Sequence, residues 1–204
     1  MKGGVENMRN ITVYRYEELS PEAQGKALSK FDLDYSDWLY DDMILVFRDR
    51  VGNLIDNFSL EYSLDYCQGD GVCFYGKLEG KKELLALAKL VYGNDIPHDI
   101  KRLCEQEILW SVDFRKISYY YSHPYTVDIY TEANRNYFLP HTEKIVNRFE
   151  KHIKNWFIDL CKDMEKYGYD YIGYYNSDEC KKEYIADAMI EYFEDGSVLR
   201  RNRK

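Results

Sequence analysis

The loop Cys67–Val72 carries the most distinctive local pattern in the chain, with Gln68 and Asp70 interleaved with Gly69 and Gly71. Two glycines permit positive φ and let a ligand approach the backbone amides, so Asp70 could bind a metal ion or act as a general base. Gly-Asp-Gly is also ordinary hairpin-turn chemistry, and the loop lacks the GxGxxG and GxxxxGK patterns of phosphate cradles. The pattern therefore favours a turn and leaves a ligand site open.

A lone histidine stands among tyrosines in the segment Tyr119–Tyr125. His123 could act as a general acid or base near neutral pH. It could equally be a turn residue, because no other histidine lies at metal-ligand spacing from it. The tyrosines could stack on a purine ring, but at strand spacing they are also typical of cross-strand packing. With Gln68 and Asp70, His123 makes up an alternative ligand site.

Residues 31–42 (FDLDYSDWLYDD) hold five acidic residues and no basic one, with aromatic residues between them. An acidic and aromatic surface can imitate nucleic-acid charge and occupy a basic groove on a partner protein. The alternative is a solvated helix face, with acids placed favourably near the helix N-terminus. The candidate partner-binding residues are Asp34, Tyr35, Asp37, Trp38, Asp41 and Asp42.

Basic residues recur along one predicted helix and again at the end of the chain. Lys144, Arg148, Lys151 and Lys154 form a basic stripe, and residues 200–204 form a basic tail. Both could touch phosphate or an acidic partner. On a chain with 36 acidic and 28 basic residues, and a net charge of −8, direct binding of nucleic acid is not expected.

Several classes of protein lack their usual signatures in this sequence. There is no HExxH, GxSxG or Walker pattern, which lowers the expectation of an enzyme without removing it. The five cysteines are widely spread, with no CxxC pair, so we expect free thiols in a reducing cytoplasm and no resident metal or cofactor. No apolar run is long enough to span a membrane, and the N-terminus has no apolar core of a signal peptide.

The positions of apolar residues predict the elements that must place these groups. Strands are expected at 11–16, over 57–66 and 72–78 as one hairpin, and over 110–132 as a second hairpin with Ser122–Pro124 at its tip. Helices are expected from Pro21 through Phe31, from a Ser36 cap to about Gly52, and over 81–92, 97–109 and 141–167, with a last one capped by Ser177. Residues 169–176 should be a tyrosine-rich connection. In the longest helix, Ile145, Phe149, Ile153, Trp156, Leu160 and Met164 should form one buried stripe.

This order of elements predicts an α+β fold, in which an antiparallel sheet of two hairpins and an N-terminal strand is faced by helices. No repeat or Pro-, Gly- or Ser-rich linker divides the chain, so we expect one domain over residues 11–199. It would be flanked by a flexible segment at 1–10 and the basic tail at 200–204. Strand order and oligomeric state are not predicted.

Four segments resemble a family of small accessory proteins carried by bacteriophages and prophages. They are the opening YRYEELSPEA at 14–23, the element YCQGDGVCFYG at 66–76, the tyrosine-rich Ser122–His123 hairpin, and Ser177-Asp178-Glu179 followed by YFEDG at 192–196. Cys67 stands where the family more often has serine, and His123-Pro124 replaces a longer turn. The resemblance implies a phage origin and the cytoplasm of an infected bacterium, and it implies no activity.

Three hypotheses of function follow. In the first, a phage-encoded protein binds and inhibits a host protein or ribonucleoprotein complex, such as a CRISPR effector, through its acidic and aromatic surface. The second is binding or processing of a small ligand or nucleotide near Gln68, Asp70 and His123. The third is nucleic-acid binding through the basic stripe.

Overall fold

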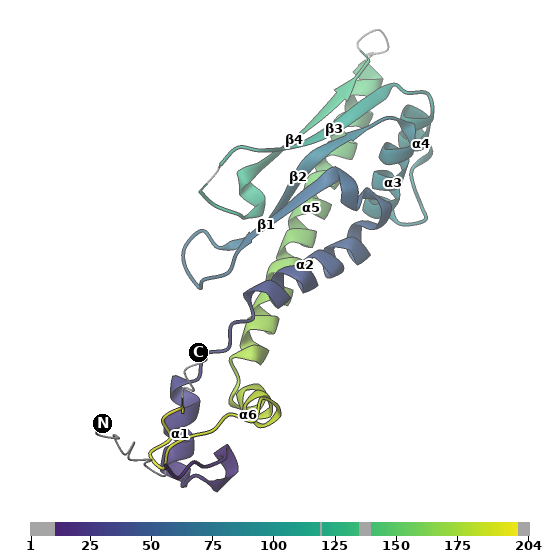
Figure 1. The fold of residues 1–204 in the computed structure, drawn as a ribbon. Helices are drawn as coiled ribbons and strands as arrows, with labels where there is room; N and C mark the ends of the chain where they lie inside the picture. Colours follow the sequence, from purple (N-terminus) through teal and green to yellow (C-terminus); the bar gives the residue numbers. More distant parts are fainter. Residues whose placement is uncertain (1–10, 119, 135–139, 200–204) are drawn as a thin grey trace, which may run out of the picture. The chain divides into compact units, whose positions relative to one another are not determined.

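A computed structural model describes residues 11–118, 120–134 and 140–199 (Figure 1). The chain forms two compact units. The terminal unit combines the segment up to Tyr35 with the segment from Ile172 on, and the sheet unit is Ser36–Tyr171. Neither boundary lies in a Pro-, Gly- or Ser-rich segment. The predicted flexible N-terminus and basic tail lie outside the described residues, and a single domain over 11–199 stays a prediction.

The sheet unit contains a four-stranded antiparallel sheet with the order β1-β2-β3-β4. The strands are β1 (Phe58–Ser63), β2 (Gly71–Glu79), β3 (Leu109–Lys116) and β4 (Val127–Ala133). Pairs β1–β2 and β3–β4 are the two expected hairpins, and β2 also pairs antiparallel with β3. The predicted α+β class and antiparallel sheet are confirmed.

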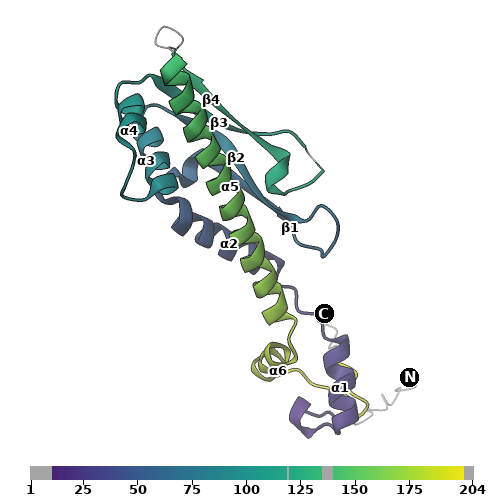
Figure 2. The same ribbon diagram turned by 180° about the vertical axis from the view of Figure 1, so that it is seen from behind.

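Helices cover the apolar face of this sheet. They are α2 (Ser36–Val51), α3 (Lys81–Tyr92), α4 (His98–Glu105) and α5 (Pro140–Tyr175), and α5 runs along the sheet in both views (Figures 1 and 2). Phe74 of β2 meets Phe47 of α2 and Phe157 of α5, with ring centroids 4.9 and 4.7 Å apart. Both helices therefore pack on the same side of β2, and the core lies between these layers.

The buried face of α5 differs from the predicted stripe at one position. Ile145, Phe149, Ile153, Leu160 and Met164 are buried as expected. Trp156 is only half-buried, and the next residue, Phe157, is buried in its place. One residue along a helix turns the side chain by about 100°, so Trp156 lies at the edge of the face that packs on the sheet.

Three predicted elements were wrong in type or extent. The expected strand at 11–16 is a single bridge between Tyr14 and Tyr192, followed by the short 3-10 helix Tyr16–Glu18. The expected helix over 97–109 ends at Glu105, because β3 begins at Leu109. The expected connection at 169–176 is helical through Tyr175, since α5 continues past its predicted end at 167.

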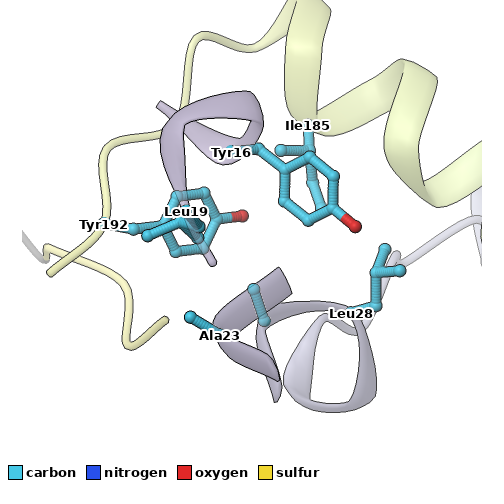
Figure 3. Packing of buried hydrophobic residues seen from close by; sticks show 7 residues of the cluster. Tyr16, Leu19, Ala23, Leu28, Ile185 and Tyr192 are labelled. Atoms are coloured by element: carbon cyan, nitrogen blue, oxygen red, sulfur yellow. The ribbon is translucent and has the colours of Figure 1, made fainter. Parts of the chain in front are cut away.

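The terminal unit is built from both ends of the described chain. It contains α1 (Pro21–Lys30) and α6 (Asp178–Asp187), whose predicted caps are confirmed: Ser20 accepts from the Ala23 amide and Ser177 from the Cys180 amide. The backbones of Tyr14 and Tyr192 exchange two hydrogen bonds of 2.9 Å. A small apolar cluster holds the unit together (Figure 3); its members are Tyr16, Leu19, Ala23, Ala27, Leu28, Ile185 and Tyr192.

Candidate ligand-binding cleft and acidic helix face

The three residues of the alternative ligand site, Gln68, Asp70 and His123, line one cleft of about 380 Å³ in the sheet unit. The loop between β1 and β2 and the connection between β3 and β4 leave the same end of the sheet (Figure 1), which brings these residues together across more than 50 positions of sequence. Lys162 and Glu165, three residues apart on α5, add a charged wall.

Hydrogen bonds to Asp70 connect this end of the sheet to the long helix α5. Its carboxylate accepts hydrogen bonds from the Ser63 hydroxyl at 3.0 Å and the Tyr169 hydroxyl at 2.7 Å. The amide and thiol of Cys67 also donate to it, at 2.8 and 3.2 Å. Four donors occupy the acceptor positions of a carboxylate, so little remains for a metal ion or a substrate proton.

The titration of Asp70 argues against the role of general base. Partial burial would raise its pKa, but the hydrogen bonds from the Cys67 amide, Tyr169, the Cys67 thiol and Ser63 outweigh burial and hold the pKa well below its ordinary value. Such a carboxylate is a weak base at neutral pH. The geometry favours the turn interpretation of Asp70, in which the residue positions Gln68 and Gly69 at the cleft.

The two flanking glycines let the two loops touch. Gly69 has φ of +96°, and a β-carbon there would lie 2.3 Å from the Tyr121 ring. A β-carbon on Gly71, where φ is +150°, would lie 2.8 Å from the His123 β-carbon. Any larger residue would push the 120–125 segment away and deform the cleft.

The ring of His123 lies near the rings of two tyrosines. Its ring centroid is 6.0 Å from that of Tyr121 and 5.9 Å from that of Tyr125. Its Nδ1 is buried and has no hydrogen-bond partner within the described part of the chain. The imidazole therefore has two phenol rings as its neighbours at the cleft.

The sequence did not indicate the contributions of α5 to this site. Tyr169 lies 99 residues from its acceptor Asp70, and it falls in a segment predicted to be a connection. Lys162 and Glu165 had the ordinary appearance of a solvated helix face. The one available signal was the helical spacing of the apolar residues, which places 162, 165 and 169 near each other along α5.

The candidate partner-binding residues divide between the two units. Asp34 and Tyr35 belong to the terminal unit, and the other four belong to α2 in the sheet unit. On α2, Asp37, Trp38 and Asp41 are exposed and Asp42 is half-buried. Within the described residues, no lysine, arginine or histidine forms an ion pair with Asp37, Asp41 or Asp42.

All four members of the basic stripe are exposed, but two have acidic neighbours. Arg148 pairs with Asp99 at 2.6 Å, and Lys154 pairs with Glu150 at 2.8 Å. Only Lys144 and Lys151 lack an ion-pair partner in the part of the chain that the structure describes. Two unpaired charges make a weak phosphate-binding surface.

All five cysteines are free, as predicted, and only Cys67 is exposed. The described residues contain no group of three or more His, Cys, Asp or Glu side chains placed to hold a metal ion. None of the described helices is both long and apolar enough to cross a membrane. Comparisons with protein-family models, curated proteins and solved structures found no match for this chain.

Proposed function

We propose that this protein binds a basic, nucleic-acid-binding groove on a host protein or ribonucleoprotein complex and inhibits that complex. The observation that carries the proposal is the exposed face of α2. Asp37 and Asp41 lie one turn apart there, beside Trp38, and Leu45 follows on the next turn. We refer to these four residues as the acidic α2 face.

The composition of this face fits a protein interface. Trp38 is 44% exposed and Leu45 is 54% exposed, although both are large apolar side chains. Exposed aromatic anchors beside charged residues are typical of interfaces, where the aromatic group gives most of the affinity and the charges steer association. The unpaired aspartates match a basic surface, because none of the cations in the described ranges forms an ion pair with them.

Inhibition of a defence complex is supported by the resemblance to phage accessory proteins. A phage gains from blocking a host effector that grips nucleic acid, and such grooves are lined with lysine and arginine. A negatively charged face on a chain of net charge −8 is suited to compete with nucleic acid for such a groove.

The test starts by capturing partners from a bacterial lysate on the immobilised protein and identifying them by mass spectrometry. The captured complex is then challenged with duplex DNA and with RNA, and its association is followed by surface plasmon resonance at two salt concentrations. The proposal expects a partner that binds nucleic acid. It also expects added DNA or RNA to displace that partner from the immobilised protein. It also expects Asp37→Asn with Asp41→Asn to slow association and to flatten its dependence on salt.

Matched variants separate this surface from overall charge. Trp38→Ala should act mainly on the dissociation rate, as the loss of an anchor. The double variant Asp159→Asn with Asp163→Asn removes the same charge from exposed positions on α5 and should bind like wild type. The proposal would be refuted if both double variants slowed association equally. It would also be refuted if nucleic acid did not displace the captured partner.

A further inference from the structure

The walls of the cleft between the 66–71 loop and the 120–125 segment are aromatic and accessible. Tyr121 and Tyr125 are 50% and 68% exposed while lining the cleft, and the His123 ring lies within about 6 Å of both. Aromatic rings that line a concave, solvent-filled space favour a planar or a cationic group, which gains stacking and attraction to the ring faces.

The charges in the cleft select a cation. Asp70 and Glu165 give two negative charges, against one positive charge from Lys162. The oxygens of Asp70 are occupied by four donors, so its charge contributes to the field without offering a free acceptor. Glu165 has no ion-pair partner among the described residues and is free to accept.

His123 adds an unsatisfied position at the same place. Its Nδ1 is buried without a partner, and buried polar atoms of folded proteins are nearly always hydrogen-bonded. With the ring proton on Nε2, Nδ1 accepts a hydrogen bond. Because Nδ1 has no accessible surface, a ligand in the cleft reaches it only if the imidazole turns, so in this arrangement the ring of His123 serves the cleft as part of its aromatic wall.

We propose that this cleft binds a guanidinium group, presented by an arginine side chain of a peptide. Guanidinium is planar and always charged, stacks on aromatic faces, and carries five donors, of which a fork of two suits the carboxylate of Glu165. A phosphate-bearing ligand is disfavoured by the two carboxylates. The cleft shares no residue with the acidic α2 face, so this inference is independent of the proposed function.

Titration of the full-length protein with N-acetyl-arginine amide, followed by amide NMR, tests the assignment. Saturable shifts should appear at the amides of Gln68, Gly69 and His123. The lysine analogue should bind more weakly, because it lacks a planar fork, and adenosine should bind more weakly still. Adenosine binding as tightly as the arginine compound, or no saturable shift at these amides, would overturn the proposal.

Two substitutions on α5 have opposite expected effects. Glu165→Gln should weaken binding about tenfold or more, because a charged acceptor is lost. Lys162→Gln should strengthen binding about twofold, since a repelling charge is removed. Glu143→Gln, at an exposed position in the first turn of α5, is the matched control and should change nothing. Weaker binding of the arginine compound after Lys162→Gln would show that Lys162 does not oppose the ligand's charge and would overturn the assignment.

The aromatic contribution and the source of the guanidinium are tested separately. Tyr125→Leu should weaken binding about fivefold, while Tyr120→Leu, which changes a tyrosine that is 92% exposed and does not line the cleft, should leave it unchanged. A blocked Gly-Arg-Gly peptide should bind at least as tightly as free arginine. Binding of free arginine alone would contradict the assignment to a peptide side chain.

Discussion

At the scale of single residues, Asp70 shows how a residue with catalytic chemistry can serve structure instead. Its carboxylate joins β1, the following loop and α5 through donors from Ser63, Cys67 and Tyr169. The hairpin turn was predictable from Gly69 and Gly71, which flank it. The partner on α5 was not, because a contact between residues 99 positions apart leaves no trace in local spacing.

Replacing Asp70 tests this role through stability. Asp70→Asn should lower the free energy of unfolding by about 1 to 2 kcal/mol at neutral pH, after allowing for solvent screening. Because the folded-state pKa lies below the unfolded value of about 3.9, this contribution is present above that pH and fades as the pH falls below about 4. Urea unfolding at pH 7 and pH 3 measures it, with Asp65→Asn as the exposed control.

The same variant should alter the reactivity of Cys67. The hydrogen bond that the thiol donates to Asp70, together with the negative charge of that carboxylate, raises the pKa of Cys67. Asp70→Asn removes the anion, so more thiolate forms and alkylation by iodoacetamide at pH 8 should be faster. Unchanged alkylation together with unchanged stability would show that Asp70 does not hold the loop.

At the scale of elements, α5 shows how accurately the buried face of a helix can be predicted from the spacing of its apolar residues. Phe157→Ala should cost about 3 to 5 kcal/mol, because its buried ring packs against Phe74 and Phe114. Trp156→Ala should cost less, about 1 to 2 kcal/mol, since the indole is half-buried and lines a groove with Arg50. Urea unfolding of both variants decides, and a larger loss for Trp156→Ala would contradict the packing.

The elements that were predicted well are those set by local chemistry. The serine caps at Ser20 and Ser177 and the alternation in β1 and β2 act within a few residues, so spacing alone reveals them. The errors lie where distant contacts decide. Residues 11–16 have strand-like composition, but the described structure offers them only one bridge, at Tyr192. The tyrosines at 169–175 suggested a loop, yet they continue α5, where Tyr169 gains Asp70 as an acceptor.

At the scale of the whole molecule, the α+β class followed from the order of the elements, whereas the division into two compact units did not. The terminal unit joins α1 to α6 and Tyr192, which lie about 150 residues farther along the chain. A pattern confined to neighbouring residues carries no information on such a pairing. The candidate cleft was predicted only in part for the same reason. Its turn residues form a pattern within a few positions of the sequence, whereas the residues that α5 contributes are distant in sequence from that turn.

A truncated chain tests this pairing of the two ends. A chain that stops after Asp187 keeps α6 but loses Tyr192, which is fully buried in the terminal cluster. The amides of α1 should then lose protection against hydrogen exchange, because Tyr16, Leu19 and Ala23 lose a buried neighbour. A chain that stops after Leu199 is the control and should keep its protection. Full protection of α1 in the shorter chain would show that the cluster does not depend on Tyr192.

The pairing of the two ends also sets an order of events during synthesis. Residues 11–35 leave the ribosome early, but their partners Ile185 and Tyr192 are translated 150 or more residues later, on the order of ten seconds at ordinary elongation rates. Throughout that interval the apolar side chains of α1 are exposed in the nascent chain, and chaperones that bind apolar segments have access to them. We expect stalled nascent chains that lack residues beyond 185 to expose α1 to protease, and released chains to protect it.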